Sequence, residues 1–127
     1  MKKRISYPFN LHQHVSFALS RNKAVVALES AVITHGLPRP VNLELAREME
    51  RIIHDHKATP ATIALINGEF KIGLTNAQLE QMAAETEYIK VSLRNMGIGI
   101  ARGLSGGTTV AATLATASAA GIQVFAT

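Results

Sequence analysis

The feature that most constrains the fold is an uninterrupted apolar run over residues 24–28, bounded by Lys23 and Glu29. A run of this kind, without polar alternation, is typical of a strand buried on both faces of a parallel sheet. An amphipathic helix is predicted over residues 42–56, where apolar and charged residues separate onto two sides at helical spacing. Asn42 is expected to cap this helix. A buried strand followed by an amphipathic helix is the repeating unit of α/β proteins.

The rest of the chain continues this alternation. Thr75 and Gln78 have the spacing of a capping box, which predicts a short helix after them. Five glycines predict a loop over residues 97–107, and the apolar segment 108–120 is expected to be a helix buried on all sides. Asn67-Gly68 is a hairpin signal between two of the strands. Further strands are predicted over residues 61–66, 70–74, 88–92 and 122–127.

This order of elements predicts an α/β class with a largely parallel sheet and flanking helices, an α/β/α architecture. We expect residues 1–127 to form one domain and residues 1–14 to be a flexible N-terminal extension. The last predicted strand has no helix after it to cover the sheet. We therefore expect a truncated fold, the N-terminal portion of a longer protein, with a small domain closed by its last strand as the alternative.

Composition excludes several classes of function. The chain of 127 residues is 47% hydrophobic and 17% charged, and it has no cysteine, which excludes thiolate chemistry and disulfides. No apolar run approaches the ~20 residues of a membrane span, and no secretory signal is recognisable, so we expect a cytoplasmic protein without a membrane partner. The net charge of +4 with only 5% aromatic residues argues against nucleic-acid binding. An anionic small substrate fits this charge at least as well.

Two candidate sites follow from the positions of polar residues. Glu29 comes directly after a buried strand, where a carboxylate faces the ligand side of a parallel sheet and can exchange a proton. The alternative is a carboxylate that only pairs with a base or a loop. The segment 105–109 precedes a helix, and its glycines and the hydroxyls of Thr108 and Thr109 are typical of an anion site at a helix N-terminus. Helix capping and glycine packing explain the same segment equally well.

Lys90 and the histidines are weaker candidates. Lys90 lies inside a predicted strand, where lysine is usually an exposed edge residue, but it would provide a point charge for a phosphate in a site. His35 lies in the loop after Glu29 and could reach a substrate. His54 and His56 point in different directions on a helix and cannot share a metal ion. No metal-ligating residue is therefore predicted in this sequence.

Seven short segments spread over about residues 15–127 carry a family resemblance. They are Val26-Ala27-Leu28-Glu29-Ser30, Ile33-Thr34-His35-Gly36-Leu37-Pro38 with Asn42 following, Pro60-Ala61-Thr62-Ile63-Ala64, Ile72-Gly73-Leu74, Lys90-Val91-Ser92, Gly107-Thr108-Thr109-Val110-Ala111 and Val124-Phe125-Ala126-Thr127. In this order, the sequence resembles the N-terminal portion of the pseudouridine-5'-phosphate glycosidase family, also described as indigoidine synthase A-like.

The resemblance implies a homotrimeric α/β/α enzyme that uses a divalent metal, typically manganese. Such enzymes reversibly split the C–C glycosidic bond of pseudouridine 5'-phosphate into uracil and ribose 5-phosphate. In the family the glutamate matching Glu29 is the proton donor, and the lysine matching Lys90 contacts the substrate phosphate. The segment matching Thr109 and Val110 also touches substrate, and we add Thr108 and His35 as expected substrate contacts. A lysine of the family forms an imine with the opened ribose, which makes the bond cleavage resemble a retro-aldol step.

Two departures from the family pattern limit what this chain is expected to do. The nucleophilic lysine and the metal-binding aspartate lie in the part of the family beyond Thr127, so the metal ligand is expected outside this chain. The family usually follows Lys-Val-Ser with Arg-Arg-Asp, where this chain has Leu93-Arg94-Asn95. We therefore expect a glycosidase that is incomplete in this chain alone, and the alternative is a non-catalytic remnant or sugar-phosphate-binding module.

Overall fold

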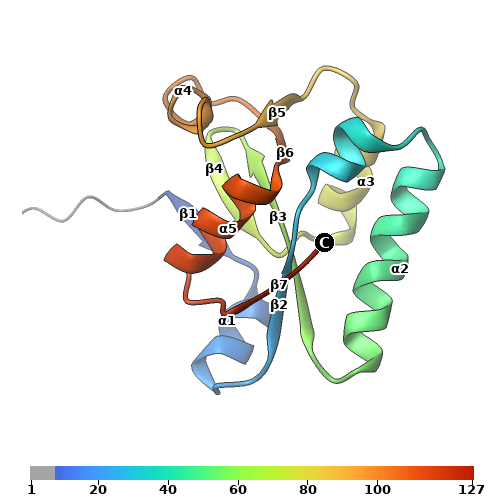
Figure 1. Cartoon of the computed structure of the whole chain (residues 1–127), viewed down its shortest axis with the longest axis vertical. Helices are drawn as coiled ribbons and strands as arrows, with labels where there is room; N and C mark the ends of the chain where they lie inside the picture. Colours follow the sequence, from blue (N-terminus) through green and yellow to red (C-terminus); the bar gives the residue numbers. More distant parts are fainter. Residues whose placement is uncertain (1–7) are drawn as a thin grey trace, which may run out of the picture.

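The structure, a computed structural model, describes residues 8–127, and the first seven residues lie outside the described part (Figure 1). Each predicted strand is present, although most are shorter than expected. The elements in chain order are β1 (Phe9–Leu11), α1 (Gln13–Ser20), β2 (Val25–Leu28), the π-helical turn η1 (Val32–Gly36), α2 (Val41–Asp55), β3 (Thr59–Ile66), β4 (Glu69–Ile72), α3 (Asn76–Ala84), β5 (Ile89–Val91), α4 (Met96–Ala101), β6 (Gly106–Thr108), α5 (Val110–Ala119) and β7 (Val124–Ala126).

The sheet is built around β3, and most of its strand pairings are parallel. The main order is β1-β4-β3-β2-β7, with β6 also paired to β3 and β5 paired to β6. The β3–β4 and β3–β6 pairs are antiparallel, and the other pairs are parallel. The prediction of a largely parallel α/β sheet is thus confirmed, with antiparallel pairs at the centre.

One edge of β3 is shared by two strands that approach from opposite directions. β2 runs parallel to the first half of β3, where Leu28 pairs with Thr62. β6 runs antiparallel to the second half, where Gly107 pairs with Ala64. The carboxyl ends of β2 and β6 therefore meet beside Ile63. This head-on meeting places the residues that follow both strands at one position of the sheet.

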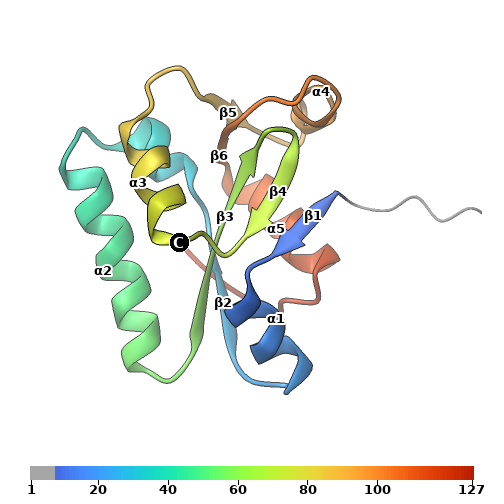
Figure 2. The ribbon, with the colours of Figure 1, turned by 180° about the vertical axis from the view of Figure 1, so that it is seen from behind.

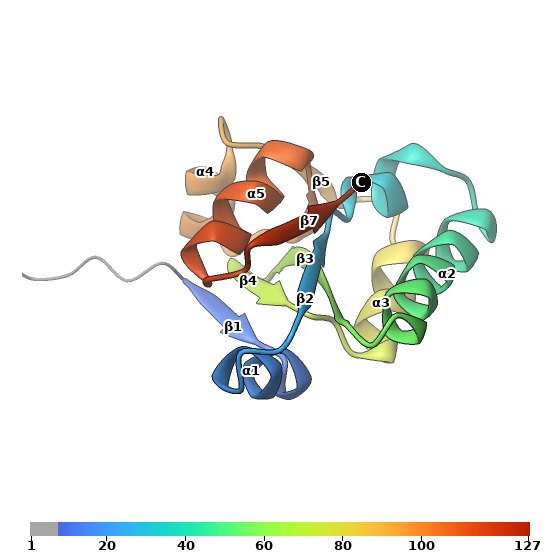
Figure 3. The same cartoon turned by 60° about the horizontal axis from the view of Figure 1, so that its bottom comes forward.

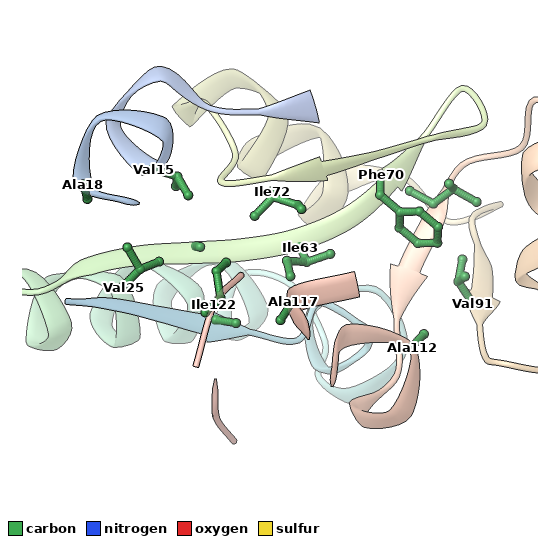
Figure 4. Close-up of a cluster of buried hydrophobic side chains, with 13 residues drawn as sticks. Val15, Ala18, Val25, Ile63, Phe70, Ile72, Val91, Ala112, Ala117 and Ile122 are labelled. Atoms are coloured by element: carbon green, nitrogen blue, oxygen red, sulfur yellow. The ribbon is translucent and has the colours of Figure 1, made fainter. Parts of the chain in front are cut away.

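Helices cover both faces of this sheet (Figures 2 and 3). Successive side chains of a strand point to opposite faces, so Ile63 and Leu65 pack with α1 and α5, whereas Ala64 and Ile66 pack with α2, α3 and η1. Figure 4 shows the first of these clusters, in which Ile63 lies near Ala117 of α5 and Phe70 lies toward Val91 of β5. The two clusters form a core on each side of β3, as expected for an α/β/α arrangement.

Local signals in the sequence predict several of these elements correctly. The hairpin between β3 and β4 turns at Asn67 and Gly68, both of which have positive φ. The capping box is complete, because the Thr75 side chain accepts from the backbone of Gln78 and the Gln78 side chain accepts from the backbone N–H of Thr75. These features depend on residues close in sequence and need no information about the rest of the fold.

Other expectations are wrong. Within the expected flexible extension 1–14, residues 8–14 contain β1, which pairs with β4, and the start of α1, while residues 1–7 lie outside the described part. The glycine-rich segment 97–107 contains most of α4 and the first two residues of β6 rather than only a loop. Asn42 does not cap α2; it is buried, and its side-chain amide donates to the carbonyls of Ile33 and Ala83.

Helix α5 also differs from expectation, because only one side of it is buried. Ala112, Thr113, Thr116 and Ala117 face the sheet, whereas Leu114 is 47% exposed.

In the described part of the chain, no helix is both long enough and apolar enough to cross a membrane.

Candidate functional site

The meeting point of β2 and β6 is held by a buried network of hydroxyl groups. The Ser30 hydroxyl donates to the carbonyl of Ile63 at 2.6 Å and accepts from the backbone N–H of Thr108 at 2.8 Å. The Thr108 hydroxyl donates to the same carbonyl at 2.7 Å, and its oxygen lies 2.8 Å from that of Thr113. Buried polar groups that are fully hydrogen-bonded fix one geometry. Ser30 therefore ties the turn after Glu29 to the strand before α5.

Two glycines let β6 fit into this crowded position. A Cβ on Gly106 would lie 2.1 Å from the carbonyl oxygen of Ile89. A Cβ on Gly107 would lie 2.2 Å from the hydroxyl oxygen of Thr34 and 2.8 Å from the carbonyl oxygen of Ser30. Both glycines are thus required by neighbouring protein atoms. The packing explanation of the glycine-rich segment is the one that the structure supports at these two positions.

An open depression of about 220 Å³ lies where β2 ends, and three predicted site residues line it. Glu29 follows β2, His35 comes from η1, and Lys90 lies on β5, which is separated from Glu29 by some sixty residues of chain. The carboxylate of Glu29 accepts a hydrogen bond from the hydroxyl of Thr127. The lining is completed by Ala31, Val32 and Gly36. The fold therefore brings together an acid, an imidazole and an ammonium group.

The turn after Lys90 is fixed by Asn95. Its side-chain oxygen accepts from the backbone N–H of Ser92 at 2.7 Å, and its amide donates to the carbonyl of Lys90 at 3.0 Å. The second of these bonds needs an amide donor, which an ionised aspartate lacks. Asn95 is thus accommodated by the local structure, whereas Leu93 is exposed and makes no contact that explains it.

Thr109 and Val110 lie at the start of α5, outside the lining of the depression. The Thr109 hydroxyl caps the helix by accepting from the backbone N–H of Ala112 at 3.3 Å. Val110 is exposed. Thr108 is completely buried, and both its N–H and its hydroxyl are bonded within the protein. The structure therefore gives Thr108 a structural role, and substrate contacts of Thr108, Thr109 and Val110 stay predictions.

Two neighbours of the predicted residues, Ser30 and Thr34, were not predicted as site residues. The Thr34 hydroxyl lies 2.6 Å from Nδ1 of His35. Both hydroxyl residues directly adjoin a candidate, Glu29 or His35, and both lie within segments that carry the family resemblance; these are the signals that the sequence offers for them. Among the described residues, no group of three histidine or acidic side chains could hold a metal ion. The depression itself offers only one carboxylate, so it does not fit a metal site on its own.

A larger cavity of about 500 Å³ lies at the amino end of β3, between α1 and α2. Its titratable residues are His12, His14, Glu50 and His54. Burial raises the pKa of Glu50, and the hydrogen bond from Thr62 at 2.6 Å partly opposes this shift. Burial, together with the nearby His14, lowers the pKa of His12. None of these residues was expected to form a site.

Comparison with known proteins finds relatives that are about half identical to this chain. The chain is 50% identical over 127 residues to a pseudouridine-5'-phosphate glycosidase of Symbiobacterium thermophilum, covering all of this chain and 40% of that protein. It is 53% identical over 110 residues to the protein of the same name from Saccharopolyspora erythraea, covering 87% of this chain and 36% of that one. The chain thus spans about 40% of the length of the curated relatives it matches.

Solved structures show the same fold. A prealnumycin C-glycosynthase in complex with ribulose 5-phosphate superposes with a TM-score of 0.84 at 36% identity, over 97% of this chain and 39% of that one. An indigoidine synthase A-like protein from Thermotoga maritima gives a TM-score of 0.84 at 29% identity, over 100% of this chain and 41% of that one. The model of the family described as indigoidine synthase A-like protein matches residues 14–127. The chain therefore belongs to the indigoidine synthase A-like family.

Proposed function

We propose that this chain supplies the N-terminal part of a pseudouridine-5'-phosphate glycosidase active site, with Glu29 as the proton donor and Lys90 as the phosphate contact. The observation that carries the proposal is the depression at the end of β2, which Glu29, His35 and Lys90 line together. About 50% identity to proteins named for this activity supports the same conclusion. The substrate class agrees with a structural relative that is described in complex with ribulose 5-phosphate.

The chemistry of C–C bond cleavage gives each of these residues a task. When the bond between sugar and base breaks, the base carbon keeps the electron pair and must receive a proton. A carboxylic acid at the end of β2 can deliver this proton if the base lies over the depression. The ammonium group of Lys90 can meanwhile hold the phosphate by a charge-assisted hydrogen bond. His35 provides a further polar group on the same surface.

The remaining parts of the proposal concern groups outside the described residues. The imine-forming lysine and a metal-binding aspartate belong to the part of the family that this chain does not match. A divalent metal, manganese by resemblance, would therefore be held there. A homotrimer also belongs to the proposal through the resemblance, and a cytoplasmic location belongs to it through the expectation from the sequence.

A chimera tests whether this chain can do its share of the reaction. Residues 1–127 are joined to the part of the Symbiobacterium thermophilum relative that follows its aligned region, and uracil release from pseudouridine 5'-phosphate is followed by chromatography. We expect turnover, and we expect Glu29→Gln to lower kcat by about 10²–10⁴-fold, which is the usual contribution of general acid catalysis.

Glu44→Gln is the matched control, because Glu44 is exposed on α2 and does not line the depression. Its chimera should retain the activity of the parent. An active chimera that is unaffected by Glu29→Gln would contradict the proposed role of Glu29. A folded chimera that binds ribose 5-phosphate but releases no uracil would instead favour the sugar-phosphate-binding module.

A further inference from the structure

Thr34 and His35 form a pair at the rim of the depression. The Thr34 hydroxyl oxygen lies 2.6 Å from Nδ1 of His35, and both residues belong to η1. His35 lines the depression together with Glu29 and Lys90. Because Nδ1 is occupied by the hydroxyl group, Nε2 is the polar ring atom that remains for a ligand.

The position of the Thr34 hydroxyl is itself determined by the surrounding backbone. The Thr34 N–H donates to the carbonyl of Ser30 at 3.1 Å, and the hydroxyl oxygen lies 3.5 Å from the same carbonyl. A Cβ on Gly107 would come within 2.2 Å of this hydroxyl oxygen. The hydroxyl group therefore lies directly over β6, in space that is open only because residue 107 is glycine. The turn after β2 and strand β6 thus fix the position of the Thr34 hydroxyl, which holds the His35 ring.

A hydroxyl group is well suited to hold an imidazole whose protonation changes. It donates to Nδ1 when that nitrogen is a lone-pair acceptor, and it accepts from Nδ1–H when the ring is protonated. The ring keeps the same orientation in both states. Nε2–H is then the donor in each of them, which suits an anionic oxygen beside the ammonium group of Lys90.

We propose that Thr34 is a positioning residue that orients His35, so that Nε2 donates a hydrogen bond to an anionic oxygen of the bound sugar phosphate. The proposal rests on the proposed function for the identity of the ligand. Its structural part, the orientation of His35 by Thr34, is independent of any ligand. The two parts therefore call for two measurements.

The first measurement needs no ligand. In the purified 127-residue chain, the ¹⁵N chemical shifts of the histidine ring nitrogens are recorded by NMR. We expect Nδ1 of His35 to show the shift of a hydrogen-bonded nitrogen and to differ from that of exposed His54 in the same spectrum. Ring shifts of His35 that equal those of His54 in the wild-type chain would overturn the proposal without any variant.

The second measurement uses three threonine variants, each checked for a dispersed spectrum. Thr34→Val is nearly isosteric and removes the hydroxyl group, whereas Thr34→Ser retains it. We expect Thr34→Val to move the His35 ring shifts toward those of His54 and to weaken ribose 5-phosphate binding by about 3–10-fold, as loss of one hydrogen bond does. Thr34→Ser should restore both properties, and Thr86→Val is the matched control on an exposed threonine.

The outcomes separate the two proposals. If ribose 5-phosphate does not bind the wild-type chain but Thr34→Val still changes the His35 shifts, the ligand assignment fails and the orienting role of Thr34 stands. If Thr34→Ser behaves like Thr34→Val in either measurement, the hydroxyl group is not what orients the ring, and the proposal is overturned. Where the wild-type chain does bind ribose 5-phosphate, an equal affinity of the Thr34→Val variant would overturn the proposal as well.

Discussion

The depression at the end of β2 and the cavity between α1 and α2 carry similar side chains but differ in origin. The depression, about 220 Å³, is lined by Glu29 at the end of β2, Lys90 on β5 and His35 of η1. The cavity, about 500 Å³, contains more histidines and the half-buried Glu50. Its titratable side chains come from the start of α1 and from α2, beside the first residues of β3.

Size and the number of titratable groups alone would favour the cavity as the site. Ligands of open α/β sheets bind beyond the carboxyl ends of strands; the depression lies beyond the end of β2, whereas the cavity adjoins the ends of β1 and β4. The depression also contains the cation that a phosphorylated substrate needs. We therefore assign function to the smaller region, and the following experiments separate the two regions, beginning with the largest expected effect.

Removing the lysine of the depression should have the largest effect on binding. In the chimera, we expect Lys90→Met to raise KM for pseudouridine 5'-phosphate by about 10–100-fold, because a hydrogen bond to a charged group is worth about 1.5–3 kcal/mol. Steady-state kinetics would measure this, with Lys57→Met as the exposed-lysine control. A loss of kcat at unchanged KM would mean that Lys90 acts in chemistry rather than in binding.

Removing the Ser30 hydroxyl should destabilise the junction beneath the depression. Ser30→Ala leaves the buried N–H of Thr108 without its acceptor, which costs about 1–3 kcal/mol. Urea denaturation of the 127-residue chain would measure the change in the free energy of unfolding. Ser118→Ala, on the exposed side of α5, should change it by less than about 0.5 kcal/mol. Equal effects of the two variants would show that the hydroxyl network does not hold the strand ends together.

The carboxylate of the cavity should affect stability in a pH-dependent way. Burial raises the pKa of Glu50 above the usual value of a glutamate, so the folded chain binds this proton more tightly than the unfolded chain does. The stability that this provides is complete below the unfolded pKa and is lost as the pH rises through the folded pKa.

Glu50→Gln stays neutral and can still accept from Thr62, so at pH 7 it should be more stable than wild type by less than about 1 kcal/mol. The difference should shrink toward pH 4, as thermal unfolding across this range would show. If the stability of Glu50→Gln relative to wild type were lower at pH 7 than at pH 4, folding would lower the pKa of Glu50 instead of raising it.

The smallest effect is expected from the cavity histidines. His54→Gln in the chimera should leave both kcat and KM within about twofold, because His54 lies on α2 and not in the depression. Kinetics under the conditions used for Lys90→Met would measure this. A tenfold or larger change would mean that the cavity takes part in the reaction, and the comparison between the two regions would no longer hold.

The sequence predicts those parts of the fold that depend on neighbouring residues. The hairpin at Asn67-Gly68 and the capping box at Thr75 are examples, as is the buried strand before Glu29. Asn42 shows the opposite case. Its type suits a helix cap, but it lies buried between η1 and α3, where its amide satisfies two carbonyls from distant segments. The helix-capping propensity of a residue does not predict hydrogen bonds to segments that are distant in the sequence.

The candidate site is predictable to a similar extent. Glu29 and Lys90 can be proposed as candidates because one follows a predicted strand and the other lies inside one. The family resemblance adds their expected roles, proton donor and phosphate contact. Their convergence with His35 depends on β6 meeting β2 head-on beside β3, and no local pattern specifies that register. The glycines before α5 illustrate why. A phosphate-binding loop and tight strand packing both require glycine. At Gly107, the close approach of Thr34 and Ser30 is what identifies packing as the reason.

The pairing of β2 with β7 has a consequence for the order in which the chain folds. The β3–β4 hairpin joins Ile63 to Ile72, whereas the β2–β7 pair joins Val26 to Val124, across most of the sequence. Contacts between such distant residues slow folding, because a long loop must close before they form. During synthesis, the second edge of β2 therefore stays unpaired until β7 (Val124–Ala126) has been made. We expect the end of the sheet that carries Glu29 to become ordered later than the β3–β4 hairpin on the ribosome.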